Sequence, residues 1–357
     1  MTGFEGMLCS AAAQEIPLPG SATRITGWLC VEQPGAWGRD VIGDEVLGAE
    51  ITVELAARTK AAHVRPMLIR RPGRNEFEGV RTILIASSRP EGSWCERFEI
   101  TDLKQLLDLD LHLLNGPAPG IGEPVTDPLV LVCAHGKRDQ CCALLGRPIA
   151  AGLAAAYPDV WECSHTGGHR FAPAVVLLPT GLTYGRLDQD SALTMLDAAR
   201  RGEVSLTGLR GRSCYTPVEQ VAEVAVRQRI ADESFTGENP APRSFAPAPD
   251  TAPPIPGTAT ATGTSFPATG PGWTVAAGDA DSHARVGDLV VEPASAADAP
   301  IPGDPATFAG AAIVTHRDGR RWLVTARTIA YAPRQASCGA GPKPATAVVA
   351  DSVRLLG

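Results

Sequence analysis

The stretch that decides the fold reads PLVLVCAHGKRDQCCALLGRPIAAGLAAAYPDVWEC and covers residues 128–163. It opens on the apolar run 129–133, which lacks alternation, as expected for a strand buried on both faces. Residues 139–156 follow with the pattern of a helix, and Asp139 is placed to cap its first turn. The apolar segment 159–163 predicts a second strand. Strand, helix and strand in this order predict an α/β architecture.

Two further strands and two helices follow this unit. The apolar segments 174–179 and 182–187 flank Thr180-Gly181 and predict a hairpin, and helical spacing marks residues 191–202 and 218–233. The order strand, helix, strand, hairpin, helix resembles a thioredoxin-like sandwich. We therefore expect an α/β domain of that type over residues 126–235.

The preceding residues repeat the same kinds of signal. A helix is expected over residues 44–62, a short helix follows a cap at Thr101, and strands are expected at 26–33, 64–70, 81–87 and 93–100. This order over residues 22–110 suggests a degenerate copy of the same layout. We assign residues 1–125 to an N-terminal α/β half.

The composition changes sharply after this body. Residues 236–272 contain 9 prolines, with alanine, threonine and glycine filling most of the other positions. Such a segment buries too little apolar surface to offset its ordering entropy, and its prolines favour an extended linker. Residues 273–357 show period-2 segments instead, which predict a small β-rich C-terminal module.

The overall composition limits the class of protein. The 357 residues carry a formal charge of −7, which argues against a general nucleic-acid binder. No apolar run approaches the roughly 18 residues that a membrane helix needs. The N-terminus lacks the basic start and long apolar core of a signal peptide. We expect a cytoplasmic protein without nucleic-acid or membrane partners.

Cysteine and histidine cluster in one part of the chain. The 9 cysteines are odd in number and irregularly spaced, so reduced thiols are expected. Cys133 and Cys142 bracket the start of the helix, where the helix dipole favours a thiolate. His165 and His169 flank two glycines that disfavour a helix, which predicts a loop around an inorganic centre. Both pairs follow strand ends, where sites form in α/β folds.

Other interpretations of these residues stay open. Cys133-Ala-His135 and Cys163-Ser-His165 offer a rival ligand set of two C-x-H pairs. Two cysteines and two histidines also suit zinc, although eight intervening residues are long for a zinc motif. A thiol oxidoreductase is a third alternative, but the chain lacks C-x-x-C.

Three segments together resemble a known family. They are WLCVEQPGAWGRD (28–40), CAHGKRDQCC (133–142) and HTGGHRFA (165–172), and the resemblance to the sucrase/ferredoxin-like family covers roughly residues 9–235. It implies a thioredoxin-fold ferredoxin carrying a 2Fe-2S cluster. The cluster ligands that it implies are Cys133, Cys142, His165 and His169.

The resemblance also implies a role. A cluster with two neutral imidazoles should have a potential above the about −400 mV of an all-cysteine plant-type ferredoxin. An electron carrier with transient redox partner proteins is expected rather than a catalyst. The sequence shows no paired-carboxylate signature of glycoside hydrolysis, and we assign no catalytic residue. Arg138, Arg170 and Arg186 are candidates for steering an acidic partner.

Overall fold

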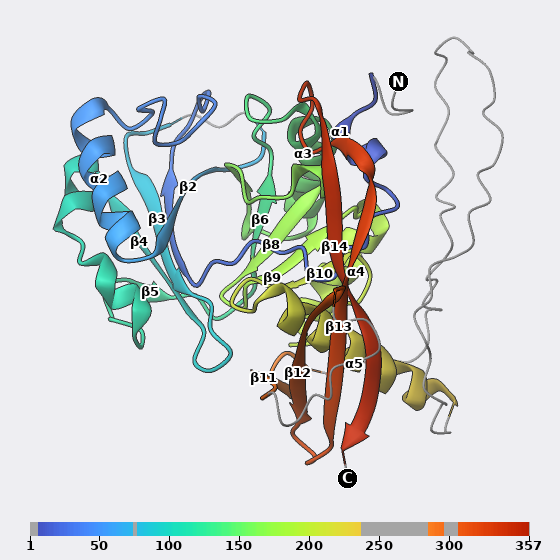
Figure 1. Cartoon of the computed structure of the whole chain (residues 1–357). Coiled ribbons are helices and arrows are strands. Elements are labelled where there is room, and N and C mark those ends of the chain that lie inside the picture. Colours follow the sequence, from blue (N-terminus) through green and yellow to red (C-terminus); the bar gives the residue numbers. More distant parts are fainter. Residues whose placement is uncertain (1–5, 74–76, 237–284, 296–305, 357) are drawn as a thin grey trace.

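The computed structural model describes residues 6–73, 77–236, 285–295 and 306–356. Beyond Thr236, the predicted linker at 236–272 lies outside these residues. The described chain forms a 10-stranded mixed sheet, flanked by helices, and a 4-stranded antiparallel sheet (Figure 1). The α/β class is therefore confirmed, together with a small C-terminal sheet.

The N-terminal part of the large sheet follows the short helix α1 (Cys9–Ala12). Its elements are β1 (Gly27–Glu32), α2 (Ala49–Ala61), β2 (Val64–Arg70), β3 (Arg81–Ser87), β4 (Trp94–Ile100), the 3₁₀ helices η1 (Leu103–Asp108) and η2 (Leu111–Asn115), and β5 (Glu123–Pro124). The expected cap at Thr101 is wrong by one residue. Asp102 caps η1 instead, because its carboxylate accepts the Lys104 N–H while Gln105 reaches back.

The second part of the sheet contains residues 128–163, whose sequence predicted the strand–helix–strand unit. Its elements are β6 (Leu129–Cys133), α3 (Gln140–Ala156), β7 (Val160–Cys163), η3 (His169–Phe171), β8 (Ala174–Leu178), β9 (Leu182–Gly185), α4 (Gln189–Arg200), β10 (Leu209–Arg212) and α5 (Pro217–Thr236). Asp139 caps α3 as expected. The sequence pattern predicted neither the strand β10 nor the short helix η3, which begins at His169 where a loop was expected.

The same topology occurs twice along the large sheet. The strand order is β10-β9-β8-β6-β7-β2-β1-β3-β4-β5. In both parts a parallel strand–helix–strand pair is extended by an antiparallel hairpin, so β7-β6-β8-β9 matches β2-β1-β3-β4. The two parts join edge to edge through an antiparallel pairing of Ile69 with Cys163.

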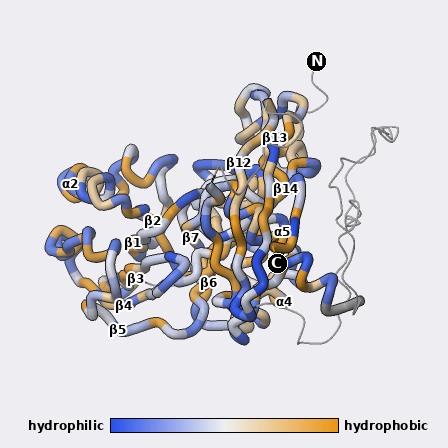
Figure 2. The backbone as a smooth tube through the Cα atoms, turned by 60° about the horizontal axis from the view of Figure 1, so that its bottom comes forward, coloured by the Kyte–Doolittle hydropathy of each residue, from blue (hydrophilic) through white to orange (hydrophobic). Residues whose placement is uncertain are grey.

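Strand β6 lies at the middle of this arrangement and is fully buried. Leu129, Leu131 and Cys133 face one hydrophobic cluster. Val130 and Val132 face a second cluster, which includes side chains of α3 and α4. Burial on both faces explains the unbroken apolar run, which is visible along β6 in Figure 2.

The C-terminal sheet is an antiparallel meander. It comprises β11 (Leu289–Pro293), β12 (Phe308–His316), β13 (Arg321–Gln335) and β14 (Pro342–Leu356), and it packs on α5 through one hydrophobic cluster. The long β13–β14 hairpin continues past α5 toward α1 and α3 (Figure 1). Its connecting loop, residues 336–341, consequently reaches the start of α3.

A buried ion network joins the two sheets to α5. The Glu223 carboxylate lies 3.1 Å from the Arg212 Nε of β10 and 2.7 Å from the Arg227 Nη2. Burial alone raises the pKa of Glu223, but the two guanidinium groups hold it below its usual range. The Arg227 side chain also donates to the Arg285 carbonyl at the start of the C-terminal sheet region.

Removing the central charge of this network should weaken the fold. We expect Glu223→Gln to lower the free energy of unfolding by about 3 kcal/mol, because two buried cations lose their carboxylate. Urea unfolding measures the loss. The control is Glu54→Gln in the exposed pair with Arg58, where less than about 0.5 kcal/mol is expected. Equal losses in the two variants would contradict a structural role for the network.

Candidate metal centre

The candidate site lies where β6 and β7 end side by side. These strands are parallel neighbours, and their last residues, Cys133 and Cys163, are directly paired. The chain leaves β6 into the loop before α3 and leaves β7 into the glycine-rich loop before η3. Both loops therefore start at the same sheet edge, as predicted from the strand ends.

The structure brings three of the four predicted ligand residues into one close group and places the fourth, His169, beside His165. The sulfurs of Cys133 and Cys142 and a ring nitrogen of His165 lie within 4.8 Å of one another. Both cysteines are fully buried. The His169 ring lies beside that of His165, with 4.9 Å between the ring centroids and a tilt of 32°.

The sulfurs of Cys133 and Cys142 are hydrogen-bonded, and each changes the pKa of the other. The hydrogen bond from the Cys142 thiol lowers the pKa of Cys133 well below its usual range, and the neighbouring His165 ring acts in the same direction. The same bond, together with burial, raises the pKa of Cys142. These contacts favour the thiolate form of Cys133. Thiolate is the form that binds a metal ion.

The histidine rings leave nitrogens without partners. Nδ1 of His165 and Nδ1 of His169 are buried, and within the described residues neither forms a hydrogen bond. Such orphaned buried polar atoms are rare in folded proteins. Burial lowers the pKa of His169, although the Asp139 carboxylate 3.8 Å from its Nε2 opposes the effect. Two sulfurs and two orphaned nitrogens fit an iron–sulfur centre with mixed ligands, and they also fit zinc.

The rival C-x-H set is less well placed. Both ring nitrogens of His135 are engaged, since Nε2 bonds to the Gly38 carbonyl at 2.7 Å and Nδ1 accepts the His165 N–H at 3.3 Å. His135 thereby positions the histidine loop. Burial raises the pKa of the Cys163 thiol well above its usual value. This geometry favours Cys133 with Cys142 as the sulfur pair.

Arg210 supports the site, and the sequence pattern did not identify it as a site residue. This fully buried side chain of β10 donates to the Gly167 carbonyl at 3.3 Å and to Ser21. A Cβ on Gly168, whose φ is +74°, would lie 2.2 Å from the Arg210 Nη2. The double glycine is therefore needed for close approach to a buried cation. Burial lowers the pKa of Arg210 to about 9.

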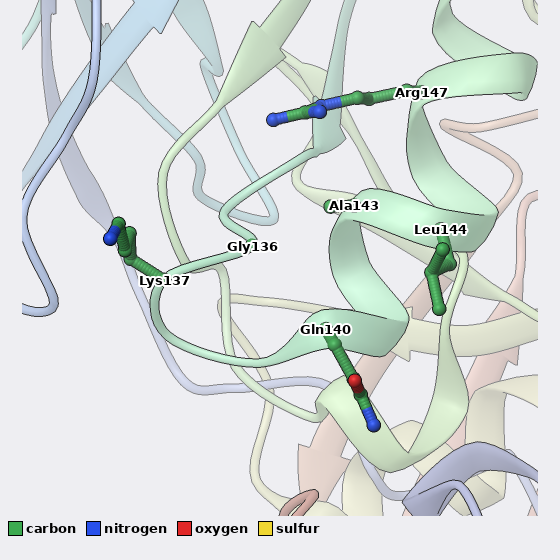
Figure 3. Close-up of a pocket in the computed structure, with 6 residues that line it drawn as sticks. All are labelled: Gly136, Lys137, Gln140, Ala143, Leu144 and Arg147. Carbon is green, nitrogen blue, oxygen red and sulfur yellow. The ribbon is translucent and has the colours of Figure 1, made fainter.

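The surface next to the site is basic. A shallow depression of about 350 Å³ is lined by the residues labelled in Figure 3: Gly136, Lys137, Gln140, Ala143, Leu144 and Arg147. Lys137, Arg138 and Arg147 are exposed there. Arg186, expected to steer a partner, instead donates to the Ala13 and Ile16 carbonyls and is half-buried.

A second group of ligand-type side chains adjoins the first. It combines Cys9, Asp139, Cys141 and Cys338, all within 4.8 Å of one another at their ligand atoms. The sequence analysis did not anticipate this group, because its members are far apart along the chain. The hydrogen bond from Cys9 lowers the pKa of the Cys141 thiol to about 6.

The fold and these two groups define an α/β protein with cysteine–histidine and cysteine–aspartate clusters of the kind that bind metals. The chain belongs to the sucrase/ferredoxin-like family, whose model matches residues 18–211. This membership confirms the resemblance stated from the three sequence segments.

The chain is similar to one curated protein over part of its length. The chain is 27% identical over 101 residues to the altered inheritance of mitochondria protein 32 of Meyerozyma guilliermondii, covering 25% of this chain and 36% of that protein. The match thus spans about a third of the relative's length. No solved structure matches the chain.

Within the described residues, no helix has the length and apolarity to cross a membrane.

Asp139 links α3 to the C-terminal hairpin and provides a test of the site's architecture. Its carboxylate accepts the Cys141 N–H at 2.9 Å, the Cys338 N–H at 2.8 Å and the Ser337 hydroxyl at 3.0 Å. We expect Asp139→Ala to lower the free energy of unfolding by about 3 kcal/mol, since the cap and two further bonds are lost.

The matched control is Asp188→Ala, which removes the exposed N-cap of α4, where the carboxylate accepts the N–H and the hydroxyl of Ser191. A loss of about 1 kcal/mol is expected there. Urea unfolding of both variants compares the two helix caps. If Asp139→Ala cost no more than Asp188→Ala, the hairpin contacts would contribute nothing to stability.

Proposed function

We propose that this chain is an iron–sulfur electron-transfer protein with a thioredoxin-like ferredoxin domain. In this proposal Cys133, Cys142, His165 and His169 hold one 2Fe-2S cluster. The observation that carries it is the grouping of two buried sulfurs with the His165 ring, beside which lies the His169 ring; within the described residues, Nδ1 of each ring has no hydrogen-bond partner. Membership of the sucrase/ferredoxin-like family is consistent with the proposal.

The protein's own residues suit such a centre. When bound, the cluster supplies one-electron oxidation and reduction. Cys133 and Cys142 would hold it as thiolates, and His165 and His169 would hold it through a ring nitrogen each. Arg210 places a buried positive charge near the sulfurs, which offsets part of their negative charge. The burial of both cysteines keeps water from the sulfur side of the site.

The imidazoles set the expected redox behaviour. A neutral ring in place of a thiolate makes the centre less negative, so its potential lies above the about −400 mV of plant-type ferredoxins. The second nitrogen of His169 faces Asp139. Burial lowers the pKa of His169, whereas this carboxylate favours the protonated ring and would support proton uptake by His169 if a bound cluster were reduced.

The partner in this proposal is an acidic redox protein that docks transiently. Lys137, Arg138 and Arg147 are exposed around the loop that follows Cys133. A basic rim next to a redox centre steers an acidic partner and sets the association rate. Electron-transfer encounters of this kind bury little surface and dissociate readily. The protein acts as a carrier, without turnover of a substrate of its own.

The visible spectrum tests this function directly. The full chain, purified anaerobically, is expected to be red-brown and to contain about two irons per chain. After reduction with dithionite, the EPR spectrum should show a low average g value. The variants Cys133→Ser, Cys142→Ser and His165→Ala should lose at least half of the iron, while His169→Ala should alter the EPR signal.

The control is Cys163→Ser, which changes a buried cysteine of the same strand edge that the proposal leaves unligated. This variant should keep the iron content and the EPR signal. A colourless protein whose bound zinc is lost in His165→Ala would replace the electron carrier with a zinc-stabilised module. Loss of the cluster in Cys163→Ser but not in His169→Ala would favour the rival C-x-H ligand set.

A further inference from the structure

The second group, formed by Cys9, Asp139, Cys141 and Cys338, plays no part in the proposed cluster. Cys9 and Cys141 are fully buried, Asp139 is 3% exposed and Cys338 is half-buried. They come from α1, from the N-cap and first turn of α3, and from the loop after β13. Folding thus brings together residues that are up to 329 positions apart.

The three sulfurs face one another inside a small apolar cluster that also contains Leu8, Leu145 and Ala172. Cys141 Sγ lies 3.6 Å from Cys9 Sγ and 3.2 Å from Cys338 Sγ, and all three thiols are free. A buried free cysteine ordinarily packs as a small hydrophobe. Here three thiols and one carboxylate lie together, and a bound cation would offset the negative charge that deprotonated thiols would add to this buried group.

The distances match a small tetrahedral ion. With metal–sulfur bonds of about 2.3 Å and metal–oxygen bonds of about 2.1 Å, tetrahedral angles place two sulfurs about 3.8 Å apart and a sulfur about 3.6 Å from the oxygen. The Cys9 sulfur lies 3.5 and 3.6 Å from the Asp139 oxygens and 3.6 Å from the Cys141 sulfur. The Cys338 sulfur lies 3.2 Å from the Cys141 sulfur, and moving it outward to about 3.8 Å would complete the tetrahedral arrangement of ligands.

We propose that Cys9, Cys141, Cys338 and Asp139 bind one zinc ion. Zinc accepts mixed sulfur and oxygen ligands, and a site closed by four protein ligands is of the structural kind. Asp139 Oδ2 is occupied by Ser337 and Cys338, so Oδ1 is the ligand atom. Oδ1 accepts the Cys141 N–H and retains a further lone pair.

The ion would fasten three separate segments over the candidate metal centre. It joins α1 and the loop of the β13–β14 hairpin to the N-terminus of α3, where Figure 1 shows them meeting. Arg334 of β13 already donates to the Ala12 carbonyl at 3.1 Å, which aligns the hairpin with α1. Since none of the four ligands belongs to the proposed cluster, this zinc site does not rest on the proposed function.

Metal analysis of the full chain tests the site. Protein expressed with added zinc sulfate and purified anaerobically without chelator should contain about one zinc per chain, measured by mass spectrometry of the elements. Cys338→Ser and Cys9→Ser should each lower the zinc content at least roughly fivefold, with the iron content unchanged. The control, Cys214→Ser, alters a buried cysteine outside both groups and should keep the zinc.

Cobalt substitution needs no variant and therefore covers the case in which a serine variant fails to fold. Wild-type protein produced with Co²⁺ should show thiolate-to-cobalt charge-transfer absorption and the visible bands of a tetrahedral ion. Absence of zinc and of these bands would overturn the proposal. Zinc retained in both serine variants, zinc lost in His165→Ala, or a Cys141–Cys338 disulfide in the anaerobic protein would overturn it as well.

Discussion

The parallel pairing of β6 with β7 is the constraint on which the site depends. Because Cys133 is paired with Cys163 at the ends of these strands, the loop before α3 and the glycine-rich loop begin at one edge. The apolar run of β6 packs on both faces, which fixes its register. Slippage of β6 by one residue would turn the Cys133 sulfur to the opposite face and separate it from His165.

The C-terminal sheet completes the surroundings of the centre. Asp139 caps α3, accepts two bonds from the β13–β14 loop and lies beside the His169 ring. One carboxylate therefore connects helix, hairpin and candidate ligand. The proposed cluster and the proposed zinc site share this carboxylate environment, so occupation of one site changes the charge that the other experiences.

Local sequence patterns predicted the parts of the molecule that local forces determine. The apolar run of β6 and the cap at Asp139 both follow from neighbouring residues, whereas the expected loop ends at Gly168 because His169 begins η3. The strand β10 was not predicted because its sequence, LRGR, lacks apolar alternation. Its arginine side chains can be buried because they have polar partners, such as Glu223 for Arg212. Distant contacts of this kind, including those of Cys338 with Cys141, become visible only in the folded chain.

The central claim is that two imidazoles and two thiolates hold one iron–sulfur cluster. Pulsed EPR of the dithionite-reduced protein, with ¹⁵N-labelled histidine, measures it most directly. The account predicts strong hyperfine coupling to two histidine nitrogens, reduced to one in His169→Ala. Reduced protein whose EPR signal shows no coupling to histidine nitrogen would contradict the account.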